Sequence, residues 1–374
     1  GRYLVRAGNC AGCHSVPGQP DYAGGRRIPT PFGDVFSSNL TPDVETGLGA
    51  WSSADFWQAM HHGKSRDGRR LSPAFPYTSY TRVTRQDTDA IFAYLRALPP
   101  VRKPTAASQL RFPYNTQFAL AVWRALYFKP EAMAPDATRS AAWNRGAYLV
   151  EGLGHCDACH TPRNLLGGLE RSSAYAGGPI PMLGWDAPPL APTTPMSGAD
   201  AQAMRQLLKN GISRDGVVSG PMAEVVFQSL QYLSVDDIAA MVDYIRTLPS
   251  RPAPPAAAVP QVYGEEMKQL LAIGSVTYKE HCAECHGDDG RGKPYVYPAL
   301  AGNPLVNAVS ATNAIQSVLH GGFGPSTAGN PQPYSMPSYR YQLSNEQVAG
   351  VLTYIRSNWG NAAPAVSSVE AGRY

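Results

Sequence analysis

The residues of this chain with the most distinctive chemistry are its six cysteines. Each belongs to a Cys-x-x-Cys pair followed directly by a histidine: Cys10-Ala-Gly-Cys13-His14, Cys156-Asp-Ala-Cys159-His160 and Cys282-Ala-Glu-Cys285-His286. Two thiols at this spacing can form thioether bonds to the two vinyl groups of one porphyrin, and the adjacent imidazole then lies under the iron as a ligand. The pattern therefore predicts three covalently bound haems c, with the three histidines as proximal iron ligands.

Other uses of paired cysteines fit this pattern less well. A disulfide framework gives no reason for a histidine after every second cysteine. A zinc site needs two ligand pairs close enough to share one ion, whereas these boxes lie far apart in the sequence. A thioredoxin-type redox pair would occur once, within a βαβ unit.

The elements that position the boxes recur along the chain with them. Each box follows a short helical stretch that carries Gly and Tyr: Gly1 and Tyr3, Gly146 and Tyr148, Gly274 and Tyr278. Each repeat closes with an amphipathic helix, predicted over 87–98, 235–248 and 345–358. These helices share a tail: Tyr94-Leu-Arg, Tyr244-Ile-Arg and Tyr354-Ile-Arg. The repetition predicts one small domain for each haem.

Capping residues and prolines predict where these closing helices begin and end. Ser234 with Asp237 predicts a capping box for the second helix, and Ser344 predicts an N-cap for the third. Pro99 and Pro249 are expected to end the first two helices, because proline cannot continue the hydrogen-bond ladder.

Length and composition are those of a folded, multi-domain protein. The 374 residues suffice for two or three domains of roughly 100–200 residues each. A hydrophobic content of 43% excludes a disordered chain, and 36 Gly with 34 Pro predict much irregular chain. The net charge is only +4 and the chain has no block of Lys and Arg, which excludes a nucleic-acid partner. The sequence also has no apolar run long enough to predict a membrane-spanning helix. Since Gly1 already reads as helix, we expect residues upstream of it.

The three repeats resemble the class I cytochrome c fold. In that family the first and last helices cross beside the haem edge, and small Gly and aromatic Tyr form the crossing. The resemblance covers nearly the whole chain and implies a mainly α protein of three tandem class I cytochrome c domains with Gly/Pro-rich loops. The expected domains are 1–105, 140–252 and 262–374, the last with a C-terminal tail; 106–139 and 253–261 are linkers.

The first linker contains an apolar stretch, Gln117-Phe-Ala-Leu-Ala-Val-Trp-Arg-Ala-Leu-Tyr-Phe, which predicts a short helix. We favour a strut packed between domains 1 and 2. A docking surface for a partner subunit or a membrane is the alternative. The second linker is rich in Pro and Ala and is expected to be semi-rigid.

The resemblance implies a methionine as sixth iron ligand, on a loop just before the last helix. Domain 3 offers Met336 in Tyr334-Ser-Met-Pro, and domain 2 offers Met222 in Ser219-Gly-Pro-Met. Met204 and Met182 are interpreted as packing residues. The family loop also supplies a proline carbonyl to the proximal histidine, a role that the resemblance gives to Pro298.

Domain 1 departs from the family pattern. Its matching loop has Phe75 where methionine is expected, and phenylalanine cannot bind iron. We favour His61 at the end of a predicted helix as the sixth ligand, with Met60 second and a five-coordinate iron third. The adjacent His62 aligns with His320 of domain 3, whereas His61 has no histidine counterpart. Two exposed histidines without a ligand role are the remaining alternative.

Five stretches carry a closer resemblance: 30–34 (Thr-Pro-Phe-Gly-Asp), 38–43 (Ser-Asn-Leu-Thr-Pro-Asp), 155–164 around box 2, 219–226 around Met222 and 297–303 around Pro298. They are similar to those of the triple-haem cytochrome c subunits of bacterial membrane-bound dehydrogenases. The resemblance implies an electron-transfer subunit without catalysis of its own. It would relay electrons from a catalytic dehydrogenase subunit to ubiquinone of the respiratory chain. It would associate peripherally with the periplasmic face of the cytoplasmic membrane.

The features of domain 1 bear on the catalytic partner. The Met-His-His-Gly sequence with Pro-Ala-Phe-Pro-Tyr looks most like cytochromes that serve molybdopterin enzymes with an iron–sulfur subunit, either aldehyde dehydrogenases or N-heterocycle hydroxylases. We favour that partner and aldehyde oxidation. A quinoprotein alcohol dehydrogenase or a flavoprotein sugar dehydrogenase is the alternative. Two rival functions remain: a multihaem peroxidase, with haem 1 open to peroxide, and a free soluble electron carrier.

Overall fold

The computed structural model describes residues 1–192, 194–249 and 262–374. The expected linker 253–261 lies outside the described residues. The chain folds into two compact units: unit 1 comprises Gly1–Gly177, Pro189–Pro195 and Gln228–Pro252, and unit 2 comprises Gly178–Pro188, Met196–Phe227 and Ala253–Tyr374. Boxes 1 and 2 therefore belong to unit 1, and box 3 belongs to unit 2.

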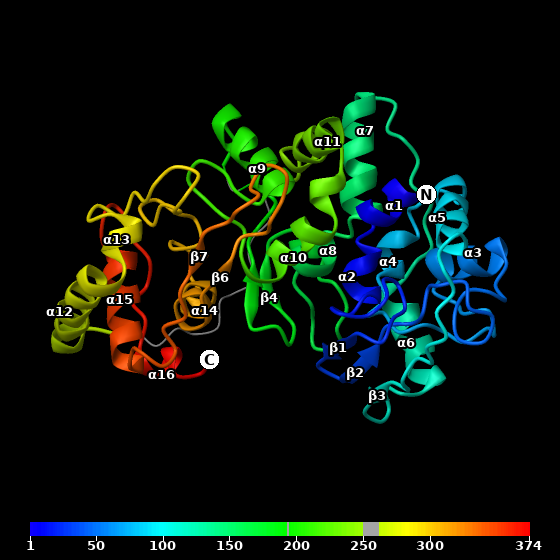
Figure 1. Ribbon diagram of the computed structural model, residues 1–374, viewed down its shortest axis with the longest axis horizontal. Helices are drawn as coiled ribbons and strands as arrows, with labels where there is room; N and C mark the ends of the chain where they lie inside the picture. The colour runs from blue at the N-terminus through cyan, green and yellow to red at the C-terminus, as the bar shows by residue number, and fades with distance from the viewer. Residues whose placement is uncertain (193, 250–261) are drawn as a thin grey trace. The chain divides into compact units, whose positions relative to one another are not determined.

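Unit 1 is mainly helical (Figure 1). Its helices are α1 (Arg2–Ala7), α2 (Cys10–His14), α3 (Ser53–His62), α4 (Tyr77–Tyr80), α5 (Arg85–Arg96), α6 (Gln117–Tyr127), α7 (Ala141–Ala147), the π-helix η1 (Tyr148–Leu153), α8 (Asp157–His160), α11 (Val235–Ile245) and the 3₁₀ turns η2 (Arg171–Ser173) and η3 (Leu230–Tyr232). A small antiparallel sheet joins β1 (Arg27–Thr30), β2 (Gly33–Phe36) and β3 (Gln109–Leu110), with Arg27 opposite Phe36 and Gly33 opposite Leu110.

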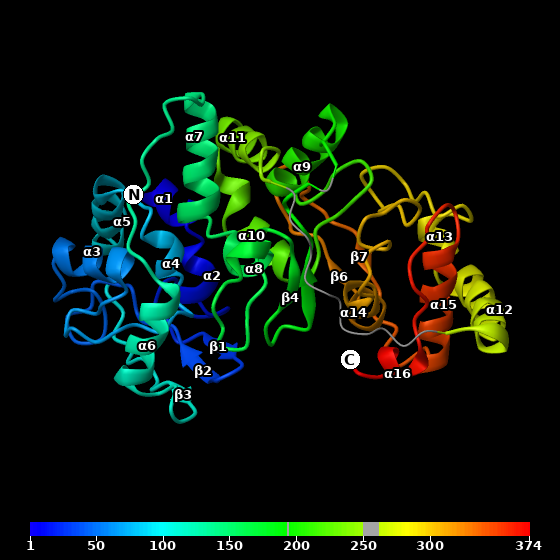
Figure 2. The same ribbon diagram turned by 180° about the vertical axis from the view of Figure 1, so that it is seen from behind.

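Unit 2 is also mainly helical, as Figure 2 shows from behind. It contains α9 (Gly198–Asn210), α10 (Gly220–Gln228), α12 (Gly264–His281), α13 (Ala283–His286), α14 (Thr312–His320), α15 (Asn345–Ser357) and α16 (Ser368–Ala371). Two hairpins pair β4 (Gly178–Ile180) with β5 (Trp185–Ala187) and β6 (Gly322–Phe323) with β7 (Ser335–Met336). Its core is built on α15, whose Val348, Val351 and Leu352 are buried against Leu270 and Ile315.

The first and last helices of each repeat cross at a glycine, as the resemblance implies. The three pairs are α1 with α5, α7 with α11, and α12 with α15. A methyl group added at Gly146 would overlap the carbonyl oxygen of Ala240, and one at Gly274 would overlap that of Gly350. The closing-helix tyrosine of the shared tail packs against each glycine in turn: Tyr94, Tyr244 and Tyr354. The mainly α fold of class I cytochrome c type is confirmed.

The arginine of the shared tail binds loop carbonyls in the first and third repeats. Arg356 is 1% exposed and donates hydrogen bonds to the carbonyl oxygens of Val306, Ala308 and Pro364. Arg96 donates to the carbonyl oxygen of Leu48 in the first repeat. Each guanidinium thus ties the closing helix to loop carbonyls, and in the third repeat the contact is buried.

The helix before box 2 contains one residue more than its counterpart before box 1, counted from Gly146 and from Gly1. The extra residue is accommodated by the π-helical turn η1, which widens the helix locally. The chain enters boxes 1 and 2 with a similar backbone conformation, because the residue before the first cysteine has a positive φ in both. This angle is 48° at Asn9 and 38° at His155. The insertion therefore leaves the geometry of the attachment turn unchanged.

The predicted helix ends are close to those observed. The closing helices α5 and α11 end at Arg96 and Ile245, before Pro99 and Pro249, as expected. Ser344 is the N-cap of α15 and forms a capping box with Gln347, which confirms the expected cap.

The expected linker helix is present as α6, and it contacts elements on both sides. Gln117 exchanges hydrogen bonds with the backbone of Arg70, and Trp123 donates to the carbonyl oxygen of Leu166 at 2.9 Å. Arg124 lies over the ring of Tyr77. Each described helix is too short or too polar to cross a membrane.

Part of the segment assigned to domain 2 packs on α14 of the third repeat. The β4–β5 hairpin is held there by Asn313, which bonds both the N–H and the carbonyl oxygen of Asp186 at 2.8 Å. Gln316 donates to the carbonyl oxygen of Gly184 at 2.8 Å. These amide side chains supply hydrogen-bond partners for the backbone of the hairpin. The hydrophobic pattern of the sequence does not reveal this contact.

The crossing glycines generate a stability prediction. We expect Gly274→Ala to destabilise the haem-loaded protein by about 1–3 kcal/mol, since the new methyl group must push apart two helix backbones. Thermal unfolding followed by circular dichroism measures the loss. Gly198→Ala is the matched control, because a Cβ at this helical position meets no atom within 4 Å. Equal unfolding temperatures for Gly274→Ala and wild type would contradict this account of the crossing.

Candidate functional site

Each Cys-x-x-Cys-His box occupies one short helical turn. Box 1 forms α2, box 2 spans Cys156 and α8, and box 3 spans Cys282 and α13. On such a turn, side chains three and four positions apart lie on one face, so both thiols and the imidazole can reach the same porphyrin. The six cysteines all lie within the described part of the chain and are free thiols.

The first cysteine of each box is enclosed by protein. Burial raises the pKa of Cys10 and of Cys156 to about 12, and that of Cys282 to about 11. Catalytic redox cysteines have a lowered pKa, so these pairs do not fit a thioredoxin-type role.

A backbone carbonyl orients the box histidine in boxes 1 and 3. The Nδ1 atom of His14 lies 2.7 Å from the carbonyl oxygen of Ser38, and that of His286 lies 3.0 Å from the carbonyl oxygen of Pro298. An N–H at Nδ1 leaves Nε2 as the free ligand atom of a neutral imidazole. Burial lowers the pKa of both histidines, which favours this neutral form. The residues present therefore fit a covalently bound haem.

The contact expected for Pro298 is thus present, whereas the equivalent role of Ser38 was missed from the sequence. The stretch 38–43 around Ser38 was recognised as family-like, and this was the available signal. No proline marks the carbonyl in repeat 1. A backbone acceptor carries no side-chain signature, so only the folded loop identifies it.

The loop that carries Met336 is anchored beside box 3. Met336 pairs with Gly322 in the β6–β7 hairpin. Tyr339 donates from its hydroxyl to the carbonyl oxygen of His281, the residue before the box, at 2.8 Å. Met336 and Cys282 pack against the same hydrophobic core. The loop is therefore positioned to present a side chain near box 3.

The other methionines have different surroundings. Met222 lies in the first turn of α10, in unit 2, and its ligand role toward haem 2 stays a prediction. Met204 lies within α9. Met182 is 60% exposed with a φ of 63°, so its interpretation as a packing residue is wrong. A loop with left-handed backbone turns this side chain toward solvent.

In domain 1, the end of α3 buries two of the candidate ligands. Met60 and His61 are 5% and 8% exposed, so the alternative of an exposed His61 is wrong. His61 stacks on Trp57 with ring centroids 4.3 Å apart, and α3 packs on α4 and α5. The Nδ1 atom of His61 is buried with no hydrogen-bond partner among the described residues. A buried imidazole nitrogen without a partner is what an absent ligand would leave.

The surroundings of His61 and Phe75 bear on whether either side chain could be an iron ligand. Desolvation and the neighbouring His62 lower the pKa of His61, which favours the neutral form that a metal ligand needs. Phe75 packs on Tyr80 and Tyr77 with ring centroids 5.4 and 6.5 Å apart. It therefore has an aromatic packing role in place of a ligand role.

The sequence of this chain is similar to those of known proteins. The Cytochrome c family model matches residues 1–99 and 271–359. The chain is 42% identical over 98% of its length to a nicotinate dehydrogenase subunit of Pseudomonas putida, of which it spans 30%. It is 36% identical over 97% of its length to the cytochrome c subunit of alcohol dehydrogenase (quinone) from Gluconacetobacter polyoxogenes, of which it spans 81%.

The gluconate 2-dehydrogenase cytochrome c subunit of Pantoea cypripedii is also similar, with 36% identity over 98% of this chain and 86% of that subunit. The likeness extends through all three repeats, beyond the two segments that the family model matches. Attachment boxes, helix crossings and relatives agree. The chain belongs to the cytochrome c family, and within it to the cytochrome c subunits of bacterial dehydrogenases.

Proposed function

We propose that this chain is an electron-transfer subunit that relays single electrons through three haems c. The observation that carries the proposal is the threefold recurrence of a Cys-x-x-Cys-His turn beside a glycine helix crossing. Electrons would come from a catalytic dehydrogenase subunit and pass to ubiquinone at the periplasmic face of the cytoplasmic membrane. The iron ligands would be His14, His160 and His286 on one side.

On the other side of the irons we propose Met336, Met222 and His61. Met336 is supported by its anchored loop beside box 3, and His61 by its burial and its unpartnered Nδ1 atom. Met60, buried in the turn before His61, is the second choice for haem 1. A histidine ligand lowers the haem potential relative to a thioether, so haem 1 would have the lowest potential of the three.

For the catalytic partner we propose a molybdopterin enzyme with an iron–sulfur subunit. The Met-His-His-Gly sequence at the end of α3 and the Phe75 substitution support this choice. Similarity to a nicotinate dehydrogenase subunit favours an N-heterocycle as substrate beside the aldehyde that the sequence suggested. The similarity to a quinone-type alcohol dehydrogenase subunit keeps the quinoprotein partner as the alternative.

For peripheral membrane contact we propose the exposed face of α6 and the adjoining loop. Phe118, Leu126 and Leu165 are 79%, 62% and 97% exposed, and Trp123 ties the loop to the helix. Residues 110–130 contain three cations and no Asp or Glu. Exposed apolar side chains beside cations and Trp suit an anionic lipid surface.

Haem 1 ligation can be tested by His61→Ala in the haem-loaded protein. We expect haem 1 to turn from low-spin to high-spin in the electron paramagnetic resonance spectrum, while the other two haems are unchanged. The near-infrared thioether–iron band of the native protein should correspond to two haems in three. His320→Ala is the matched control, because this exposed histidine also ends a helix.

Different results of this experiment have distinct meanings. If the thioether–iron band of the native protein corresponds to all three haems, the sixth ligand of haem 1 is Met60 and not His61. A native high-spin haem that shifts with peroxide would replace the relay by a multihaem peroxidase. A haem content other than three per chain, measured as the pyridine haemochrome, would contradict the proposed cofactor count.

Membrane contact can be tested with vesicles of phosphatidylglycerol and phosphatidylethanolamine. We expect Phe118→Ser with Leu126→Ser to weaken binding at least about tenfold, since two exposed apolar side chains no longer enter the interface. Added salt should weaken wild-type binding, because the cations are screened. The control Tyr341→Ser, at a side chain 94% exposed, should bind as wild type. Undiminished binding of the double variant would exclude this face as the contact.

A further inference from the structure

The N-termini of the closing helices reveal a contact that the sequence did not suggest. In a complete capping box, the side chain at the third helical position accepts a hydrogen bond from the N–H of the N-cap residue. The third repeat has this arrangement: Ser344 N–H donates to Gln347 Oε1 at 2.9 Å, and Gln347 N–H donates to Ser344 Oγ at 3.2 Å. Its helix α15 is capped by its own residues.

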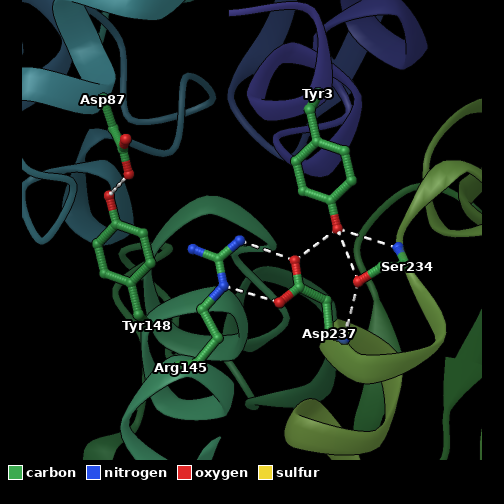
Figure 3. Close-up of polar contacts among 6 residues, drawn as sticks. All are labelled: Tyr3, Asp87, Arg145, Tyr148, Ser234 and Asp237. Atoms are coloured by element: carbon green, nitrogen blue, oxygen red, sulfur yellow. Dashed lines mark hydrogen bonds and ion pairs between the residues drawn. The ribbon is translucent and has the colours of Figure 1, made fainter. Parts of the chain in front are cut away.

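The expected capping box of α11 forms only in half. Ser234 Oγ accepts from Asp237 N–H at 3.1 Å, but the carboxylate of Asp237 does not return to the N–H of Ser234. Instead the hydroxyl of Tyr3 lies between them: Ser234 N–H donates to it at 3.0 Å, and it donates to Asp237 Oδ2 at 2.5 Å (Figure 3). The expected box is therefore completed by a residue of the first repeat.

The same arrangement occurs a second time, in the opposite direction. Thr84 caps α5 by accepting from Asp87 N–H at 3.2 Å. Thr84 N–H donates to the hydroxyl of Tyr148 at 3.2 Å. This hydroxyl donates to Asp87 Oδ2 at 2.6 Å (Figure 3). Here a tyrosine of the second repeat completes the cap of the first.

The two contacts use equivalent positions. Tyr3 and Tyr148 are each the second residue after the crossing glycine, and Asp87 and Asp237 each occupy the third helical position. Each repeat therefore gives a tyrosine and receives one. A contact in which both partners use the same patch is the pattern of a two-fold related pair.

A second reciprocal pair lies beside the first. The guanidinium of Arg6 lies 4.2 Å above the ring of Tyr232, and Arg82 forms an ion pair with Glu151 at 3.5 Å. Arg6 and Glu151 are both the fifth residue after a crossing glycine, and Tyr232 and Arg82 both stand two residues before an N-cap. The chemistry differs between the two sites, but the positions correspond.

Arg145 strengthens one of the two tyrosine contacts. Its guanidinium binds both oxygens of Asp237, at 2.8 and 2.7 Å, and this pairing lowers the pKa of the carboxyl (Figure 3). Asp237 is 9% exposed, so its charge is kept in the interface by a bidentate partner and a phenol.

The third repeat lacks the groups that make this contact. Val276 occupies the position of the tyrosine and is 54% exposed, and Gln347 occupies the position of the aspartate. Gln347 already closes the cap of its own helix. The tyrosine cap is therefore specific to repeats 1 and 2.

The interface also brings attachment boxes 1 and 2 to the same side chain. Tyr80 donates from its hydroxyl to the carbonyl oxygen of Gly8, two residues before box 1, at 2.9 Å. Its ring lies 5.4 Å from that of His155, the residue before box 2. Ser79 donates to the carboxylate of Asp157, inside box 2, at 2.9 Å. The two boxes thus flank α4.

We infer that repeats 1 and 2 form a fixed two-haem module, closed by the reciprocal tyrosine caps, which positions boxes 1 and 2 for direct electron exchange. The inference rests on the proposed relay function. Boxes 1 and 2 would each hold one haem, and the two haems would supply a pair of one-electron centres, so that an electron lost by one iron would be gained by the other. Tyr3 and Tyr148 are positioning residues that act through the helix caps.

The test removes both hydroxyls, with Tyr3→Phe and Tyr148→Phe combined in the haem-loaded protein. We expect the amide N–H groups of Thr84 and Ser234 to exchange with deuterium at least about tenfold faster, because each loses its acceptor. The amide of Ser344, in its own complete box, should be unchanged. Tyr341→Phe, at a phenol 94% exposed, is the matched control and should behave as wild type.

The second measurement follows electron redistribution between haems 1 and 2 after flash photoreduction. We expect a slowing of about tenfold in the double variant, with haem content and spectra unchanged. If amide exchange is unchanged in the double variant, the tyrosine hydroxyls do not cap the two helices. If exchange is faster but the electron-transfer rate is unchanged, the caps exist but do not position the two boxes. If the double variant shows faster amide exchange but the wild type shows no electron redistribution at all, the relay itself fails while the caps stand.

The charge of Asp237 adds a pH prediction. Arg145 on α7 and Tyr3 on α1 face this carboxyl, with Asp236 exposed on its own helix, and its folded pKa lies below the ordinary value. Its contribution to stability is therefore complete above the unfolded pKa, about 3.9, and is lost as pH falls through the folded pKa. Asp237→Asn should lower the unfolding temperature at pH 7, and the difference from wild type should shrink toward pH 3.

The control for the pH prediction is Asp236→Asn, which removes the same charge from the same helical turn. Its unfolding temperature should stay close to that of wild type at both pH values. An equal effect of the two variants at pH 7 would show that the interface makes no special use of Asp237.

Discussion

The close approach of two helix backbones at a glycine is the contact on which the other features of each repeat depend. It brings the end of the first helix, where the attachment box begins, to the start of the last helix, before which the candidate ligand segment lies. Only a residue without Cβ allows this approach, as Gly146 and Gly274 show. The tyrosine of the shared tail packs on the glycine, and in repeats 1 and 3 the arginine of the tail binds nearby loop carbonyls.

In the first two repeats, the N-terminus of the closing helix also takes part in the contact between the repeats. A helix N-terminus has N–H groups that need acceptors, and a complete capping box supplies them locally. In α5 and α11 the box is left open, and a tyrosine from the other repeat closes it. The same hydrogen bonds therefore satisfy a helix end and join repeats 1 and 2.

The haem sites rely on groups of two kinds. The covalent and proximal groups lie within one helical turn, so their relation follows from chain spacing. The carbonyl that orients His14 belongs to Ser38, in a separate segment, and the ligand that we propose for haem 1, the buried imidazole of His61, lies on another helix. Burial lowers the pKa of His14, His286 and His61, which favours the neutral imidazole that can bind a metal.

The sequence by itself determined the attachment boxes, the helix that closes each repeat and the cap at Ser344, because these depend on spacing within one or two helical turns. It did not determine the partner of Asp237, the acceptor of His14 or the exposure of Met182. It also did not reveal that the β4–β5 hairpin packs on α14. Only the tertiary structure decided these features, since a side chain that can satisfy its own helix can equally bind a distant group, and packing selects between them.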